Sequence, residues 1–318
     1  MNYIDKMQDL FGHKTIESEV RSIRIYADEI QDFVSPITGE KWLYTGAIYE
    51  DISKPILPDL IRTRYCTDRE NWEVFREKND AEIHWADFRK EVKKRDVINR
   101  WLEYAYNDCL GARNLHFSIL GINLSNLNVD EFDTHQNFNS IYNRFFRSML
   151  KHSLKKYFGR GVIIEEILHE QGPQQDHKYF DWHTIYKLDQ EEGLNVTEKP
   201  VCFLPKTHRE DERSNVIQFI DLLLGIFKDL HLGVNRENYQ QLKQDVLDHK
   251  FVNEILIDRV ISNPLNSNSS FGYVNRFNVS LFPNQNTEAG SQERLLNSYY
   301  DIAKVRLEYL HQHQSSLF

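Results

Sequence analysis

The sequence is poor in cysteine, glycine and proline, and it contains no long apolar run. Its 318 residues include 3 cysteines, 13 glycines and 8 prolines. Cys66, Cys109 and Cys202 are odd in number and far apart, which argues against a disulfide framework or a zinc knuckle and favours a reducing cytoplasm. No stretch approaches the roughly 18 consecutive apolar residues that a membrane helix requires, so we expect no membrane partner. Residues 1–6 lack the basic and apolar regions of a signal peptide, and we expect none.

Positive charge is also scarce relative to negative charge. The chain has 39 Lys and Arg residues against 48 Asp and Glu residues, which gives a net charge of −9. Non-specific affinity for DNA comes mainly from neutralisation of phosphates by Lys and Arg, so a general polyanion-binding protein is disfavoured. A nuclease is still compatible with this balance, because its metal site is itself built from carboxylates. With 40% hydrophobic and 13% aromatic residues, the chain can form a sizeable core.

Strand-like and helix-like segments alternate along the chain. Apolar residues follow a strand pattern at 22–26, 42–49, 116–122, 162–170 and 200–204, and a helical pattern at 90–110, 134–158 and 215–230. The breaker-rich turn at 35–39 predicts that the first two strands form a hairpin. This order of elements predicts an α/β fold in which a mixed β-sheet is flanked by helices.

The chain is expected to divide into three parts. The polar residues 1–21 predict an N-terminal arm, and residues 22–233, which hold the segments above, predict the main domain. Residues 234–318 are expected to form a C-terminal accessory region that is mostly helical, with one strand candidate at 277–282.

The sharpest candidate site is the segment Ile25-Tyr26-Ala27-Asp28-Glu29. An Asp-Glu pair at the end of a buried strand places carboxylates at the mouth of the strand, where a divalent cation can be bound. Asp28 and Glu29 are therefore candidate catalytic residues. The alternative is a strand that leads into a polar turn, with both carboxylates solvated.

Asp221 is a lone carboxylate in the apolar helical segment 215–230. Gln218 precedes it by three positions and therefore shares its helix face. A buried ionised Asp is costly unless it is paired or bound to a metal, so this position is a candidate metal ligand. The alternative is an Asp on a narrow exposed stripe of the helix, or one that is bonded to a neighbouring Arg.

Glu166 and Glu170 lie on the strand segment 162–170. Because side chains alternate along a strand, both point to one face and His169 points to the other. Either Glu can supply a third metal ligand or a general base. The alternative is an edge strand with a polar outer face.

The segment 82–88 alternates between polar and apolar residues. Its His84 and Asp87 are candidates for positioning substrate or relaying a proton, and the alternative is that each is structural. The sequence contains no P-loop, no dinucleotide-binding glycine motif and no G-x-S-x-G motif, and no His pair has the H-E-x-x-H spacing of a zinc site.

Together, these segments resemble the family known as domain of unknown function 3800, which has a ribonuclease H-like fold. The resemblance covers roughly residues 22–230 and rests on four short motifs in a common order, at 26–32, 82–88, 168–171 and 218–225. Two positions depart from the family pattern. Ile30-Gln31 replaces the usual Ser-Gly, and His169-Glu170 replaces an Asp-Glu pair, which leaves open whether Glu166 or Glu170 takes the third position.

The resemblance implies that the first strand and a parallel neighbour end side by side, with a later helix across their ends. Asp28, Glu170 and Asp221 would then form one carboxylate cluster that binds Mg²⁺ or Mn²⁺, and Glu29 or Asp87 would complete the set. The implied activity is metal-dependent hydrolysis of RNA or DNA, in the setting of bacterial defence or mobile elements.

Substrate binding is expected from His84, Asp87 and Gln218, and from a local basic strip, because the chain as a whole is acidic. Two strips are candidates: Lys151, Lys155, Lys156 and Arg160, and Arg89, Lys90, Lys93, Lys94 and Arg95. From these we select Lys155 as a substrate-binding candidate. The alternative is that both strips are ordinary solvated helix faces.

Two other functions compete with the nuclease. One is a non-catalytic binding module that keeps the fold and uses its C-terminal region for a partner. The other is a hydrolase of small phosphorylated molecules, which suits the acidic surface better. The aromatic-rich helical segments at 138–150 and 295–310 can serve either the core or a homodimer surface.

Overall fold

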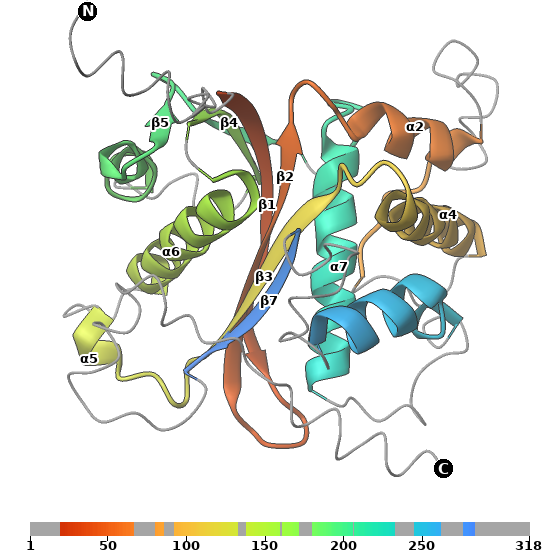
Figure 1. Ribbon diagram of the computed structural model, residues 1–318. Coiled ribbons are helices and arrows are strands. Elements are labelled where there is room, and N and C mark those ends of the chain that lie inside the picture. The colour runs from red at the N-terminus through yellow and green to blue at the C-terminus, as the bar shows by residue number, and fades with distance from the viewer. Residues whose placement is uncertain are drawn as a thin grey trace, which may run out of the picture.

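The computed structural model describes residues 20–66, 80–85, 92–132, 138–159, 161–171, 180–205, 207–232, 245–261 and 276–283. In this part of the chain, seven strands form one mixed sheet between two layers of helices (Figure 1). The strand order is β5-β4-β1-β2-β3-β7, and β6 pairs with the remaining length of β4. The predicted α/β fold with a mixed sheet is therefore confirmed.

Three antiparallel strands form the centre of the sheet. β1 (Arg21–Val34) and β2 (Lys41–Asp51) form the predicted hairpin, and β3 (His116–Asn123) continues beside β2. In the connection between β1 and β2, Gly39 has a φ of 72°, in the left-handed region that favours glycine.

The outer strands run parallel to their neighbours. β4 (Val162–Glu170) lies beside β1, and both β5 (Leu194–Val196) and β6 (Val201–Leu204) pair with β4. At the other edge, β7 (Phe277–Phe282) pairs with β3, so the strand candidate at 277–282 belongs to the main sheet.

One face of the sheet is covered by α6 (Phe138–Phe158), with α5 (Val129–Phe132), η2 (Phe180–Ile185) and η3 (Tyr186–Gln190) beside it. A buried core joins α6 to one face of β1, β2 and β4; its members on α6 are Ile141, Tyr142, Phe145, Phe146, Met149, Leu150 and Leu154. The helix ends before Gly159, whose φ of 76° lies in the left-handed region in which helices commonly end with glycine.

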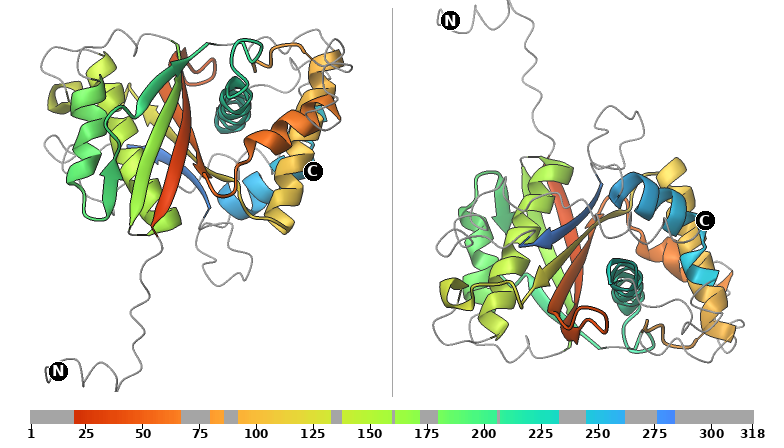
Figure 2. Two further views of the ribbon diagram at one scale, coloured as in Figure 1. Left: turned by 90° about the horizontal axis from the view of Figure 1, so that it is seen from above. Right: turned by 90° about the horizontal axis from the view of Figure 1, so that it is seen from below.

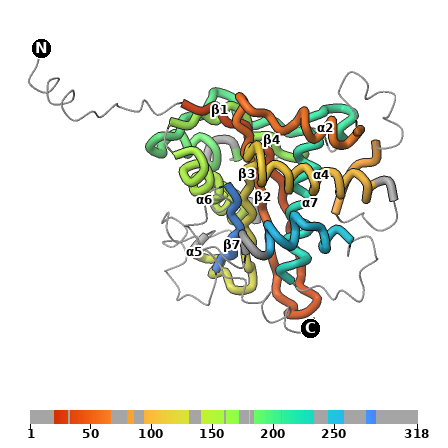
Figure 3. Tube along the Cα trace, turned by 45° about the vertical axis from the view of Figure 1, so that its right-hand side comes forward, coloured from red at the N-terminus to blue at the C-terminus, as the bar shows by residue number. Residues whose placement is uncertain are grey.

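The other face is covered by α7 (Ser214–His231), which contacts β1, β2 and β4. Outside α7 lie α2 (Leu57–Tyr65), α4 (Val92–Leu110) and η5 (Phe251–Ile261) (Figure 2). Because α7 is enclosed between the sheet and this outer layer, it is apolar on nearly all sides. Figure 3 shows α6 and α7 on opposite sides of the strands.

Some sequence expectations take a different form or lie outside the described residues. Between β4 and β5, residues 180 to 190 form a π-helical turn followed by a 3-10 turn. Residues 80–85 form neither helix nor strand. The helical segment expected at 295–310 and nearly all of the N-terminal arm lie outside the described residues. Since η5 contacts α4 and β7 extends the sheet, these C-terminal segments share the core, while the domain boundaries stay predictions.

Candidate carboxylate site

The parallel strands β1 and β4 bring two carboxylates to the same level of the sheet. The register of the two strands ends one residue before Asp28 on β1 and one residue before Glu170 on β4. Tyr26 and Leu168, two residues earlier on each strand, belong to the core beneath α7. Because side chains alternate along a strand, Asp28 and Glu170 point to the α7 side as well.

Asp221 lies on α7, the helix that covers this face of the sheet, and its negative charge acts on Asp28. Asp28 is only 5% exposed. Burial raises the pKa of Asp28 well above its ordinary value, and the negative charges of Asp221, Glu170 and Glu29 raise it further. The hydrogen bond that Asp28 Oδ1 accepts from the backbone N–H of Glu29, at 2.8 Å, opposes this rise. Asp28 is therefore a buried carboxyl group surrounded by like charges.

One stripe of α7 holds Ile83 and Trp85 in place. The side-chain oxygen of Gln218 accepts the backbone N–H of Ile83 at 3.0 Å, and Asp221 Oδ2 accepts that of Trp85 at 2.8 Å. About two turns further along, Asp229 Oδ2 accepts the indole N–H of Trp85 at 2.7 Å. The helical spacing of these acceptors thus fits the path of one docked segment.

Gly225 completes this stripe because it leaves room for the Trp85 ring. A Cβ atom at position 225 would lie 2.0 Å from Cγ of Trp85, so the indole can rest against α7 only where the helix has no side chain. The spacing of Gln218, Asp221 and Gly225, on which the family resemblance partly rests, therefore has a packing explanation that is independent of catalysis.

His84 lies at the edge of the carboxylate group. Its Nε2 atom is 2.7 Å from Glu82 Oε1, and its Nδ1 atom is 3.6 Å from Asp221 Oδ2. The Asp221 carboxylate raises the pKa of His84 to about 9, against the lowering effect of burial and with a further contribution from Glu82. His84 therefore places a positive charge next to Asp221 at neutral pH.

Glu29, a predicted catalytic residue, lies on the opposite face of the sheet from Asp28. Its Oε2 atom is 3.1 Å from His169 Nε2, and its Oε1 atom accepts an N–H from Gln31 at 2.8 Å. The His169 Nε2 atom is also 2.8 Å from the hydroxyl oxygen of Tyr142 on α6. Adjacent residues of a strand point to opposite faces, so the structure separates Glu29 from the carboxylates on the α7 side.

Glu166 and Glu170 have different surroundings. Glu166 accepts an N–H from Arg24 Nε at 2.6 Å and lies 3.4 Å from Arg213 Nη1, so its charge is already paired. Glu170, by contrast, contributes to the raised pKa of Asp28. The structure therefore favours Glu170 as the third carboxylate.

Gln218 does not have the surroundings of a substrate-binding residue. It is 2% exposed, and besides Ile83 it contacts Arg64 Nη1 at 3.1 Å and His208 Nδ1 at 3.3 Å. Its polar atoms are engaged with the protein itself, so we assign Gln218 to the docking of residues 82–85.

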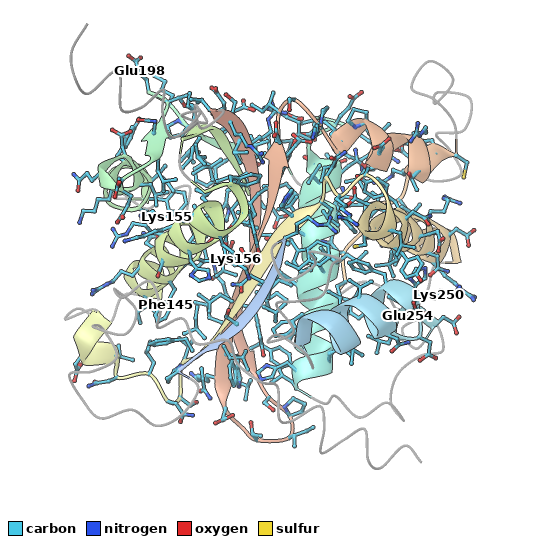
Figure 4. All side chains as sticks on the ribbon, in the orientation of Figure 1. Phe145, Lys155, Lys156, Glu198, Lys250 and Glu254 are labelled. Atoms are coloured by element: carbon cyan, nitrogen blue, oxygen red, sulfur yellow. The ribbon has the colours of Figure 1, made fainter. Side chains whose placement is uncertain are left out.

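Lys155 lies on α6, on the far side of the sheet from α7 (Figure 4). Its Nζ atom is 3.2 Å from Glu191 Oε2, and Lys151 contacts the same carboxylate at 2.7 Å. The structure therefore does not bring Lys155 together with Asp28 and Asp221. Asp87, another substrate-binding candidate, lies outside the described residues, as do Arg89, Lys90 and Arg160.

A buried polar network that the sequence does not reveal supports the α7 side. Arg64 is fully buried, and its Nη1 atom donates to Asn215 Oδ1 at 2.7 Å and to Gln218. Asp80 Oδ1 lies 2.6 Å from His208 Nε2 in the same region. An Arg in a short amphipathic helix looks like a surface residue, so no sequence pattern distinguishes Arg64.

As the side chains stand, no three or more His, Cys, Asp or Glu residues among those described are grouped so as to hold a metal ion. Within the same residues, no helix is both long and apolar enough to cross a membrane. No protein-family model, curated protein or solved structure matches this chain.

Proposed function

We propose that this protein is a divalent-metal-dependent nuclease with a ribonuclease H-like fold. Asp28, Glu170 and Asp221 would hold Mg²⁺ or Mn²⁺. The observation that carries the proposal is the burial of Asp28 among carboxylates whose charges raise its pKa. A buried group of like charges is costly unless a cation neutralises it, and a metal ion would supply that neutralisation.

The donor set fits a hard divalent cation in its chemistry, because all three candidate ligands are carboxylates. A cation bound there would supply an activated water and stabilise the leaving oxygen of a phosphodiester. Since the described side chains do not already gather three ligands around one point, binding requires the carboxylates to draw together. Asp221 can take part while it still accepts the N–H of Trp85 through Oδ2, because its Oδ1 is a second acceptor.

The topology supports the ribonuclease H-like part of the proposal. β1, β2 and β3 form an antiparallel meander, β4 lies parallel to β1, and α7 contacts both β1 and β4. The family resemblance implies two parallel strands that end beneath a later helix: β4 does end there, at Glu170, whereas β1 continues past Asp28 to Val34.

A hydrolase of small phosphorylated molecules is a second candidate for the same site. The net charge of −9 disfavours extended contact with a polyanion. Lys155, which was expected to line a nucleic-acid path, lies on the other face of the sheet and is paired with Glu191. A small phosphodiester would need no such path.

The two candidates can be tested together by measuring Mn²⁺-dependent cleavage of single- and double-stranded RNA and DNA, and of bis-p-nitrophenyl phosphate. Asp28→Asn and Asp221→Asn remove a charge but keep the oxygen that accepts a backbone N–H. We expect each variant to lose activity by on the order of 100-fold, since changes around metal ligands commonly cost 10–100-fold.

Glu165→Gln is the matched control, because Glu165 lies on β4, five residues before Glu170, and accepts a hydrogen bond from Ser22 near the start of β1. It should retain the wild-type rate. Equal activity in the wild type and in both Asn variants would eliminate the proposed mechanism. Cleavage of the small phosphodiester without cleavage of any nucleic acid would select the second candidate.

A further inference from the structure

The α6 side of β1 and β4 carries a buried polar cluster directly behind the candidate site. Glu29 on β1 and His169 on β4 form an ion pair across the strands, with 3.1 Å between Oε2 and Nε2. The side chain of Glu29 is 8% exposed and that of His169 is 1% exposed. Each of these residues is the immediate chain neighbour of a candidate metal ligand, Asp28 or Glu170.

His169 also contacts the backbone of the residue that follows it. Its Nδ1 atom is 3.0 Å from the carbonyl oxygen of Glu170. Since a carbonyl oxygen only accepts hydrogen bonds, Nδ1 is the donor there, and Nε2 faces the Glu29 carboxylate. One imidazole ring therefore connects the Glu29 side chain of β1 to the backbone at the end of β4.

We infer that Glu29 and His169 are positioning residues. They fix the alignment of β1 relative to β4 and thereby the spacing of Asp28 and Glu170. This inference rests on the proposed metal site. Because the charges of Asp28 and Glu170 repel each other, β1 and β4 need a contact that holds them in place at this level, and the ion pair provides one on the opposite face.

The choice of residues supports a positioning role over a purely stabilising one. A buried ion pair is desolvated at a cost, and replacing such a pair with apolar residues of similar volume is often neutral or stabilising. Aromatic and apolar residues surround His169, including Phe146 and Phe180. An apolar pair would fit this environment, whereas an ion pair fixes one particular alignment of the strands.

The test is the affinity of the metal-free protein for Mn²⁺, measured by electron paramagnetic resonance of the free ion. The wild type is compared with Glu29→Gln, His169→Gln and the double variant. Partners of metal ligands typically contribute 10–100-fold to affinity, so each single variant should raise the dissociation constant about 10-fold. Because the two residues act as one pair, the double variant should lose about the same factor and not its square.

Two further variants separate this inference from the proposed function. Asp28→Asn should abolish Mn²⁺ binding, and Glu165→Gln, which removes the same charge from β4 five residues before Glu170, should bind within about twofold of the wild type. If Asp28→Asn abolishes binding but Glu29→Gln binds like the wild type, the positioning role is wrong and the metal site stands. Multiplicative losses in the double variant would also contradict the pair.

Absence of Mn²⁺ binding by the wild type would overturn the metal site and the positioning role with it. Thermal unfolding of each variant shows whether it is folded at the assay temperature. If His169→Gln does not fold, Glu29→Asp decides the question, because it keeps the charge and shortens the reach to His169. We then expect a loss of about threefold to tenfold in Mn²⁺ affinity, and wild-type affinity would contradict the inference.

Discussion

The same two dipeptides place charged side chains on both faces of the sheet, but the charges are opposite on one face and alike on the other. Asp28-Glu29 on β1 and His169-Glu170 on β4 each place one side chain on either face. On the α6 side, Glu29 meets His169, and the charges are opposite. On the α7 side, Asp28 and Glu170 share their surroundings with Asp221, and like charges raise the pKa of Asp28.

This difference shows that one pair of strands can carry opposite charges in contact on one face and like charges close together on the other. Opposite charges on the α6 side favour one alignment of β1 and β4. Like charges on the α7 side are costly without a counter-charge, and local costs of this kind are typical of functional sites. The predictions below test each face separately.

The largest expected effect is that of Gly225→Ala on the α7 side. The added methyl group would lie 2.0 Å from Cγ of Trp85, so the indole must leave its place against α7. Overpacking of a well-packed core commonly costs 1–3 kcal/mol, and we expect a loss of about 3 kcal/mol in the free energy of unfolding, measured with urea. In the control Gly111→Ala, the new Cβ would lie 3.3 Å from the Asn107 carbonyl oxygen, and the loss should be smaller. Equal effects would show that Trp85 moves aside easily.

The next largest effect is expected for Glu29→Gln on the α6 side. This change leaves the buried His169 without its charged partner, but the amide oxygen can still accept a hydrogen bond. Removing one partner of a buried ion pair is strongly destabilising, and with this residual hydrogen bond we expect a loss of about 2 kcal/mol in the free energy of unfolding. Glu165→Gln, at a partly exposed position on β4, the strand of His169, should lose less than about 0.5 kcal/mol. Similar losses in both variants would mean that the pair has no special role in the fold.

Asp28→Asn should have the opposite sign, because it removes a charge that the fold disfavours. The pKa of Asp28 is raised above 3.8 in the folded state, so its contribution to stability is present below about pH 3.8 and is lost as the pH rises through the folded pKa. Asn does not titrate and keeps the acceptor for the Glu29 N–H.

In metal-free buffer we therefore expect Asp28→Asn to be more stable than the wild type by about 1 kcal/mol near neutral pH. The gain should shrink toward pH 4. Urea denaturation at several pH values measures it. A variant that is less stable than the wild type at every pH would show that the ionised Asp28 is well compensated, which removes the contrast between the two faces.

The sequence predicts most of the elements in this comparison because their patterns are local. The period of two from Glu166 to Glu170 correctly separates His169 from both Glu residues, although the register of β4 shifts between Ile164 and Glu166. The same rule places Asp28 and Glu29 on opposite faces of β1. The expectation that both residues belong to one catalytic group conflicts with this alternation.

The features that the sequence does not predict depend on partners far along the chain. The docking of Trp85 on α7 joins residues separated by 136 to 144 positions, and no local pattern encodes it. The pairing of Lys155 with Glu191 is likewise a tertiary contact. The three-residue strand β5 is too short to show a period.

The smallest effect is expected for Lys155→Gln on α6. Its partner Glu191 keeps a second contact with Lys151 at 2.7 Å, so the free energy of unfolding should change by less than about 0.5 kcal/mol. Because Lys155 lies across the sheet from Asp28 and Asp221, the rates of Mn²⁺-dependent cleavage should stay within about twofold of the wild type for every substrate. A selective loss with long nucleic acids, but not with a small phosphodiester, would instead mean that the substrate extends around the sheet edge to α6. Both faces would then contribute to substrate binding, and the contrast between them would apply only to the chemistry at Asp28, Glu170 and Asp221.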